Sequence, residues 1–312
     1  MAPQSPEFAG IKPHFGAIDM RRQFVRTVER LLDSDPRLVV LLGDIGVFAF
    51  RHAMQRHPKR VINIGILEQA SVGVAAGLAK EGYIPIFHSI APFVSERAFE
   101  QIKVDFGYQA LGGHFVTVGS SYDYAALGCT HHCPGDITLM QAIPGVQIIT
   151  PGHPAEFDAL MSECFESGKP TYYRLSERSN SEARRVKFGR AEVIRAGRGP
   201  VVITTGPFLD RVIEAVGDMD STILYYTTLT PFDSETLRAY VGDGRILCVE
   251  PFYEGTLSAS ITAALRGLRI ALFSMGVPRR FLTNYGHVDD HDAACGLLAK
   301  DIRSNLEELL NV

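Results

Sequence analysis

The sequence predicts an α/β fold of two domains, a mostly parallel sheet flanked by helices followed by a smaller α/β domain. Short apolar runs, typical of strands buried on both faces, alternate with stretches of helical periodicity. A polar and charged segment at residues 176–187 interrupts this alternation and indicates a linker. We therefore expect a flexible arm over residues 1–16 and a first domain over residues 17–178. A linker over residues 179–189 and a second domain over residues 190–312 would follow.

The expected elements of the first domain begin with a helix near Met20 that stops at the Asp35-Pro36 turn. The expected strands are short and apolar, and they lie at residues 38–42, 61–64, 84–88, 115–118, 146–149 and 171–175. The expected helices between them lie at residues 68–80, 95–106, 137–142 and 155–167. Strands that alternate with helices in this way favour a parallel sheet.

The second domain repeats the pattern with expected strands at residues 201–205, 222–226, 245–250 and 269–274. Its expected helices lie at residues 210–216, 234–241, 256–265 and 299–310. The triplet Gly242-Asp243-Gly244 joins a helix to a strand, and no helix follows it to receive a phosphate group, so we interpret it as a turn.

The composition is that of an ordinary soluble protein and excludes some classes of partner. Of the 312 residues 46% are hydrophobic and 21% charged, with a net charge of −4, so we expect neither nucleic-acid nor membrane binding. The five cysteines are an odd and scattered set, which favours a reducing compartment. No apolar run is long enough to span a bilayer, and the proline-containing residues 1–16 do not resemble a signal peptide. We expect a cytoplasmic protein.

One carboxylate, Glu68, follows an apolar strand and begins a helix rich in glycine and alanine. Small residues at helical spacing let another backbone come close, so this helix start is expected to hold little water. Such a carboxylate is protonated more easily than one in water and can share a proton with a ring nitrogen. The alternative is that Glu68 only favours the positive N-terminus of the helix.

A second cluster of polar side chains occupies the segment from Gly128 to Asp136. A zinc site at Cys129, His131, His132 and Cys133 is disfavoured, because all four come from one tight turn and no second pair follows. We favour a loop histidine that donates a hydrogen bond to a bound anion or carbonyl. The alternative is an ordinary helix entry with Asp136 as the N-cap.

Two phenylalanines flank Arg97, and we expect different roles for them. Phe99 follows helical spacing with Ile102 and Phe106, which indicates the core. Phe93 precedes the expected helix at the carboxyl end of a parallel strand, where ligands of α/β sheets collect. Its ring is therefore a candidate for stacking on a planar heterocycle, with simple core packing as the alternative.

In this order, the motifs resemble the C-terminal half of the transketolase family, from about Ile18 to Leu310. The first domain resembles the pyrimidine-binding domain at Leu42-Gly43-Asp44, Gly65-Ile66-Leu67-Glu68-Gln69, Gly77-Leu78-Ala79, Arg97-Ala98-Phe99-Glu100-Gln101, Gly128-x-Thr130-His131, Asp136-Ile137-x-Leu139-Met140-x-Ala142-Ile143-Pro144-Gly145 and Pro151. The second resembles the family's C-terminal domain at Val249-Glu250 and Gly276-Val277-Pro278. The resemblance implies thiamine diphosphate as the cofactor.

The resemblance also implies roles for individual residues. Glu68 would hydrogen-bond N1′ of the cofactor's pyrimidine and so promote deprotonation of its thiazolium, and Phe93 would stack on the aminopyrimidine. His131 would face the substrate's carbonyl or hydroxyl, and Arg21 would hold a substrate phosphate. By the same resemblance we place Asp44, Ile66 and Leu67 in the cofactor site, His132 and Arg97 in the substrate site, and no metal ligand in this chain.

Full-length members of the family carry a diphosphate-binding domain ahead of the part that matches here. We therefore expect the diphosphate and Mg²⁺ to be bound mainly by a partner subunit, in an α2β2 split transketolase acting on a small-molecule ketose or 2-oxo acid. The sequence departs from sugar-using members at Leu127, where they have an aspartate, at Gly119, where they have a histidine, and at Glu177, which precedes Arg178. These departures predict a less hydroxylated substrate than the usual sugar phosphates.

Three alternatives remain open from the sequence. The β subunit of a 2-oxo-acid dehydrogenase shares the two-domain layout, but the Thr130-His131 pair favours transketolase. A 1-deoxy-xylulose-5-phosphate synthase-like enzyme would use pyruvate as the donor. A non-catalytic scaffolding subunit is disfavoured by Glu68, because a buried carboxylate without a partner costs roughly several kcal/mol.

Overall fold

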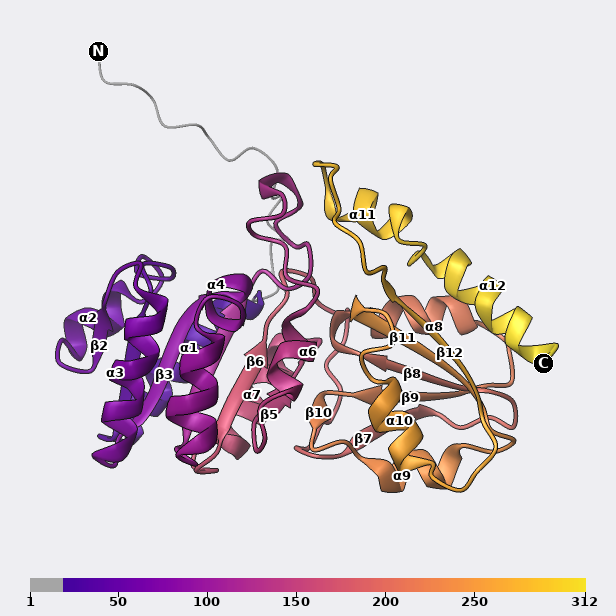
Figure 1. Cartoon of the computed structure of the whole chain (residues 1–312), viewed down its shortest axis with the longest axis horizontal. Helices are drawn as coiled ribbons and strands as arrows, with labels where there is room; N and C mark the ends of the chain where they lie inside the picture. Colours follow the sequence, from indigo (N-terminus) through magenta and orange to yellow (C-terminus); the bar gives the residue numbers. More distant parts are fainter. Residues whose placement is uncertain (1–18) are drawn as a thin grey trace, which may run out of the picture.

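The structure is a computed structural model that describes residues 19–312, and it contains two sheets that lie side by side (Figure 1). Their strand orders are β10-β5-β6-β4-β3-β1-β2 and β12-β11-β8-β9-β7. This arrangement confirms the predicted α/β class. The expected N-terminal arm, residues 1–16, lies outside the described residues. Between residues 19 and 312, no helix combines the length and the apolar character needed to cross a membrane.

The first sheet is parallel except for one edge strand. Its parallel strands are β1 (Leu38–Leu42), β2 (Val61–Asn63), β3 (Ile84–Ile90), β4 (Gly113–Val118), β5 (Gln147–Ile149) and β6 (Pro170–Arg174), and β10 (Thr228–Thr230) pairs antiparallel with β5. Its helices are α1 (Met20–Ser34), α2 (Arg51–Arg56), α3 (Glu68–Lys80), α4 (Ala91–Ser95), α5 (Phe99–Gln101), the π-helix η1 (Ile102–Tyr108), the 3-10 turn η2 (Ala125–Leu127), α6 (Asp136–Gln141) and α7 (Pro154–Cys164).

The second sheet has β7 (Ala191–Arg195), β8 (Val201–Thr205), β9 (Thr222–Tyr226), β11 (Arg245–Tyr253) and β12 (Ala271–Val277), with only β7 antiparallel to its neighbour. Its helical segments are η3 (Gly206–Phe208), α8 (Leu209–Val216), α9 (Ser234–Tyr240), α10 (Ser258–Ala264), α11 (Val288–Ala294) and α12 (Ala299–Leu310).

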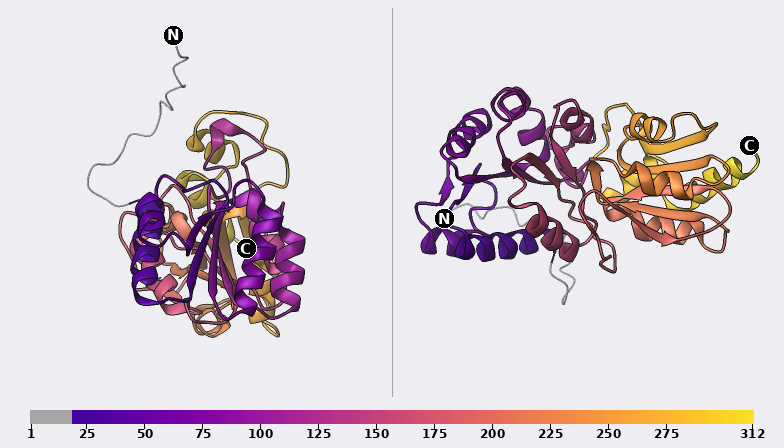
Figure 2. Two further views of the ribbon diagram at one scale, coloured as in Figure 1. Left: turned by 90° about the vertical axis from the view of Figure 1, so that its left-hand side faces the viewer. Right: turned by 90° about the horizontal axis from the view of Figure 1, so that it is seen from below.

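Burial on both faces explains the apolar runs. In β1, Val39 and Leu41 pack on one side of the sheet, whereas Leu38, Val40 and Leu42 pack on the other. Helices α1 and α7 cover one face of the first sheet, and α3, η1 and α6 cover the opposite face (Figure 2).

The helix expected over residues 95–106 is wrong as a single element. It is divided into α4, α5 and η1, and α4 already begins at Ala91, with Pro92 in its first turn. Phe93 therefore lies inside α4 and does not precede the helix. Phe106 and Ile102 are buried as expected, while Phe99 is only partly buried.

Strand β10 is the point at which the second unit enters the first sheet. It follows β9 directly and pairs with β5, and the Thr150 amide donates to the Thr227 carbonyl at 2.8 Å. The Tyr225 hydroxyl donates to Glu156 in α7 at 2.8 Å. These contacts hold the two sheets together, so loops from both reach the same edge of the molecule.

Candidate functional site

The predicted site residues lie at the carboxyl ends of neighbouring parallel strands. Asp44 follows β1, Glu68 follows β2, Phe93 follows β3, His131 lies in the loop after β4 and Glu177 follows β6. The parallel strands end at one edge of the sheet, which is where α/β folds collect ligands. Side chains that are more than a hundred residues apart in sequence therefore lie near one another.

Glu68 is the first residue of α3, and it is only 7% exposed. Its Oε1 accepts a hydrogen bond from Nη1 of Arg97 at 3.1 Å. The two residues before it, Ile66 and Leu67, are 66% and 57% exposed, which is unusual for large apolar side chains in a row. Glu68 is thus a nearly buried carboxylate that directly follows two exposed apolar side chains.

Asn63 joins the loop after β1 to the loop that leads into α3. Its Oδ1 accepts hydrogen bonds from the amide of Asp44 at 3.0 Å and the amide of Gly65 at 3.1 Å. Asp44 has a φ of 67°, a conformation that aspartate tolerates better than most residues. One side chain therefore sets the path of both loops, and nothing in the sequence alone indicated this role.

Aromatic side chains extend the site from Arg97 to Tyr124. The Arg97 guanidinium lies over the ring of Phe93, 3.9 Å from its centroid. The Phe93 and His131 rings are 5.3 Å apart edge to face, and Tyr124 lies 6.3 Å from His131 on a second side. Glu68, Arg97, Phe93, His131 and Tyr124 form a continuous row of contacts, which we call the site row.

The two adjacent histidines of the loop point to different places. His131 is partly exposed, its Nδ1 lies 2.9 Å from the Thr130 hydroxyl, and burial together with the charge of Arg97 lowers its pKa. His132 is only 8% exposed and packs against His291 of α11, with ring centroids 5.2 Å apart. The structure therefore brings His131 into the site row but leaves His132 behind it.

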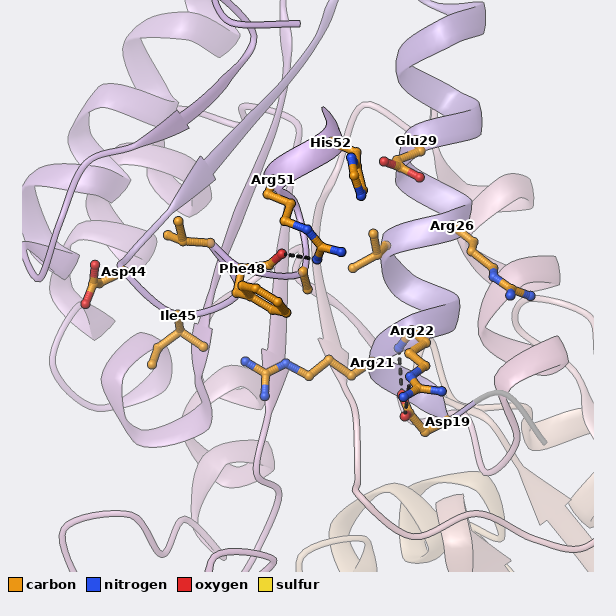
Figure 3. A pocket seen from close by; sticks show the side chains of 14 residues that line it. Asp19, Arg21, Arg22, Arg26, Glu29, Asp44, Ile45, Phe48, Arg51 and His52 are labelled. Atoms are coloured by element: carbon orange, nitrogen blue, oxygen red, sulfur yellow. Dashed lines mark hydrogen bonds and ion pairs between the residues drawn. The ribbon is translucent and has the colours of Figure 1, made fainter. Parts of the chain in front are cut away.

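A cleft of about 940 Å³ lies between α1 and the segment after β1, and two of the predicted site residues, Arg21 and Asp44, line it. Figure 3 shows Arg21 extending from α1 across this cleft toward Phe48, whereas Arg26 points outward. Phe48 is 79% exposed, and the guanidinium of Arg51 lies 4.3 Å from its ring centroid. No motif in the sequence singles out Phe48 or Arg51.

The helix entry after the His131 loop differs from the expected one. Asp136 is the first residue of α6, after Gly135 at the N-cap position, so the alternative that made Asp136 the N-cap is wrong. The carboxylate of Asp136 is fully buried and accepts hydrogen bonds from Arg174 Nε at 2.7 Å and the Tyr172 hydroxyl at 2.9 Å. A buried arginine thus competes for the carboxylate that would otherwise cap the helix.

The cysteines beside the histidines have separate neighbours. Cys133 is buried against the Ser95 hydroxyl, 3.2 Å from its sulfur, and burial raises the pKa of its thiol. Cys129 is exposed. Within residues 19–312, no three or more His, Cys, Asp or Glu side chains are grouped as a metal site would require.

A protein-family match covers the part of the chain that carries these residues. Residues 16–182 match the model described as the transketolase pyrimidine-binding domain. This match covers more than half of the chain. The chain belongs to the transketolase family.

Relatives within and around the transketolase family differ in length. An uncharacterised 33.6 kDa protein of the fasciation locus of Rhodococcoides fascians is 38% identical, over 95% of this chain and 96% of the relative. The 6-deoxy-6-sulfo-D-fructose transketolase subunit SqwH of Clostridium sp. (strain MSTE9) is 27% identical, over 91% and 92%. A 1-deoxy-D-xylulose-5-phosphate synthase of Thermus thermophilus is 30% identical, over 91% of this chain but 47% of the relative.

A solved structure shares the transketolase fold of this chain. It is titled as a split gene transketolase in an inactive beta4 tetramer, with a TM-score of 0.84 at 24% identity, over 95% of this chain and 99% of that chain. The likeness extends over both sheets, and it confirms the pyrimidine-binding fold followed by the C-terminal domain.

A buried polar network lies under the His131 loop, and no sequence motif indicates it. Asp292 of α11 is fully buried and accepts hydrogen bonds from the Tyr122 hydroxyl, Arg178 Nη1 and Arg211 Nη2, each at 2.6 Å. Burial opposes ionisation of Asp292, yet the charges of Arg178 and Arg211 hold its pKa below the usual range. Through this network Tyr122 links the chain segment before the loop to helices α11 and α8.

Proposed function

We propose that this chain is the C-terminal subunit of a thiamine-diphosphate-dependent, transketolase-like enzyme that transfers a two-carbon ketol or acyl unit. In this proposal the chain is active only with a partner subunit that binds the diphosphate and Mg²⁺, in an α2β2 assembly. The observation that carries the proposal is Glu68, a nearly buried carboxylate that is paired with the half-exposed Arg97. Two exposed apolar side chains, Ile66 and Leu67, precede it.

The residues around Glu68 fit an aminopyrimidine. The Arg97 guanidinium is a planar donor that contacts both the carboxylate of Glu68 and the ring of Phe93. An aminopyrimidine is also planar and also needs a hydrogen-bonding carboxylate and an aromatic face. Because the Arg97 side chain is 48% exposed, it can leave this position at little cost.

When bound, thiamine diphosphate would supply the nucleophilic carbon that accepts the transferred unit. Glu68 would hold a proton at a pyrimidine nitrogen, and Phe93, Ile66 and Leu67 would exclude water from the ring. Asp44, which follows β1 and lines the cleft, would face the cofactor. These assignments use only side chains that the structure places at one edge of the first sheet.

His131 and Arg97 would act on the substrate. The lowered pKa of His131 keeps its ring neutral near pH 7, so that one nitrogen donates a hydrogen bond while the other contacts Thr130. Leu127, three residues before Thr130, is 43% exposed and offers no acceptor. The proposal therefore assigns a substrate that lacks a hydroxyl at the position that Leu127 faces.

The relatives support a split enzyme. One is named a transketolase subunit and matches this chain over nearly its whole length, and the structural neighbour is titled an inactive tetramer of beta chains alone. Dependence on a partner explains why a beta-only assembly would lack activity, and the exposed Ile66 and Leu67 are suited to be covered by that partner.

The test is an assay of the complex with its partner subunit, thiamine diphosphate and Mg²⁺. We expect transfer of a two-carbon unit to an aldehyde, and a much lower rate from xylulose 5-phosphate than an ordinary transketolase shows. An ordinary rate from xylulose 5-phosphate would contradict the assigned substrate, and failure of every donor in a cofactor-loaded complex would favour the scaffolding alternative.

A second candidate is a 1-deoxy-xylulose-5-phosphate synthase-like reaction, favoured by the 30% identity to such an enzyme. Release of CO₂ from pyruvate together with formation of a new ketose would support it. CO₂ release followed by acyl transfer to a carrier would instead indicate the β subunit of a 2-oxo-acid dehydrogenase.

A further inference from the structure

A small cavity lies next to Tyr124, at the end of the site row, and both acidic and basic side chains line it. The cavity has a volume of about 230 Å³ and is lined by Asp19, Met20, Arg21, Val118, Ser176 and Glu177. It shares Asp19 and Arg21 with the larger cleft, so the two lie next to each other. Tyr124 lies beside His131, and the negative charge of Glu177 contributes to raising the pKa of the Tyr124 hydroxyl, which burial raises most. A substrate that contacts His131 therefore has its far end near this cavity.

Glu177 contributes a carboxylate to the lining of this cavity. Its amide donates to Asp123 Oδ2 at 3.0 Å, which fixes the backbone. Burial and the charge of Asp123 raise the pKa of Glu177, while Tyr124 and Arg21 favour its charged form. Arg21 Nε is buried and has no hydrogen-bond partner among the described residues. The cavity is thus lined by a guanidinium donor, Arg21, and a carboxylate acceptor, Glu177.

The other arginines near the cavity already have hydrogen-bond or ion-pair partners. Arg178 follows Glu177 in sequence but turns away to Asp292, 2.6 Å from its Nη1. Arg22 pairs with Asp19 at 3.4 Å, and Arg51 donates to the Phe48 carbonyl at 2.8 Å. Among the residues that line the cavity, Arg21 is therefore the one cation, and Glu177 is the carboxylate without a paired arginine, since Asp19 is paired with Arg22.

Steric contact, as well as charge, limits which groups can enter this cavity. A side chain at Gly119 would meet the Tyr124 ring, since a Cβ there would lie 2.2 Å from a ring carbon. Tyr124 therefore fills the position at the end of β4 from which another donor would otherwise enter. A doubly charged phosphate would meet the carboxylate of Glu177 beside the one guanidinium that lines the cavity, whereas hydroxyl groups would find both a donor and an acceptor.

We propose that Glu177, with Arg21 and Tyr124, selects a substrate whose end distant from the transferred carbons carries free hydroxyl groups and no phosphate. This inference rests on the proposed transferase function and names the substrate class of the same site. Leu127 faces a different part of the substrate, so the hydroxyl missing there and the hydroxyls bound here are compatible.

The first test compares erythrose with erythrose 4-phosphate as acceptors for the assembled enzyme. We expect kcat/KM for erythrose to be at least about tenfold higher, with the difference mainly in KM. Glu177→Gln should narrow this ratio and Glu177→Arg should reverse it, while Glu182→Gln, at an exposed position of the linker, should change nothing. A wild-type preference for the phosphorylated acceptor, or an unchanged ratio in Glu177→Arg, would overturn the proposal.

The second test needs no catalysis and separates this inference from the proposed function. Titration calorimetry of the chain with inorganic phosphate should show binding at least about tenfold tighter for Glu177→Arg than for wild type. Thermal unfolding of each variant checks that it is folded. If the complex proves inactive, the proposed function fails while the phosphate titration still decides the charge preference. Equal binding of phosphate by both proteins would refute the role of Glu177.

Discussion

Nη1 of Arg97 lies 3.1 Å from Oε1 of Glu68, while the same guanidinium covers the ring of Phe93. A half-exposed arginine thus neutralises a carboxylate that is otherwise almost buried. The pair gives the carboxylate of Glu68 a hydrogen-bond partner when no cofactor is bound, since an unpaired buried carboxylate would be costly. It also identifies the side chain that has to move when a planar group enters.

Replacing Glu68 tests the centre of the site. Glu68→Gln keeps the size of the side chain but removes the acceptor of a proton, so turnover of the assembled enzyme should fall at least about a hundredfold. Steady-state kinetics measure this loss, and native mass spectrometry should show unchanged assembly. Glu81→Gln, at the exposed C-terminal end of the same helix, is the matched control and should remain active. Near-normal turnover in Glu68→Gln would remove the proposed mechanism.

Replacing Gly128 tests the loop that carries His131. Gly128 has a φ of 73°, and a Cβ there would lie 2.7 Å from the Tyr285 ring. We expect Gly128→Ala to lower the free energy of unfolding by about 2 kcal/mol, and to lower kcat because the loop shifts. Urea unfolding measures the first effect.

Two further variants divide the effect at Gly128 into its causes. Gly267→Ala carries only the backbone strain, because Gly267 has a φ of 90° and nothing within 4 Å of its Cβ position, so it should cost about 1 kcal/mol. Adding Tyr285→Ala to Gly128→Ala should recover part of the loss. No recovery would show that the contact with Tyr285 is unimportant.

Removing the charge of Asp292 tests the network below the loop. Asp292→Asn removes the anion that Arg178 and Arg211 share, and breaking such buried pairs should lower the free energy of unfolding by about 3 kcal/mol. Asp289→Asn, exposed on the same helix, should have little effect. Equal denaturation midpoints for wild type and Asp292→Asn would contradict the structural role given to this network.

Two buried histidines predict a pH dependence of stability. Burial lowers the pKa of His88 and of His114 from 6.5 to about 4 in each case. Between these values the unfolded chain binds more protons than the folded chain, so stability is full above pH 6.5 and falls as the pH drops toward 4. Each histidine contributes on the order of 3 kcal/mol to this fall.

The contribution of one histidine can be isolated. His114→Phe keeps an aromatic ring beside Phe165, and it should roughly halve the loss of stability attributed to the two histidines between pH 6.5 and 4, measured by urea unfolding. His52→Gln, at an exposed position, should leave the dependence unchanged. If His114→Phe shows the full wild-type slope, the buried histidine does not titrate as described.

Much of the fold was predictable because the strands are buried on both faces. The alternating residues of β1 pack on opposite sides, so the entire strand is apolar and visible in the sequence. The edge strands β7 and β10 and the short helices α2 and α11 were missed, because such elements depend on pairing or packing with distant segments. The division of the helix after β3 was missed for the same reason.

The candidate site was predictable where residues are near an identifiable motif, as with Glu68, Phe93, Arg97 and His131. The structure adds what spacing cannot give, namely the direction of each side chain. His132 faces away from His131 because His291 packs against it, and Arg178 faces away from Glu177 because Asp292 binds it. Both partners come from α11, more than a hundred residues later in the sequence.

The most direct test of the central claim is native mass spectrometry of this chain purified from its own cells with thiamine diphosphate and Mg²⁺ present. We expect a complex with a second kind of chain, two copies of each, carrying the cofactor. A homo-oligomer of this chain without cofactor, from cells in which it is active, would contradict it.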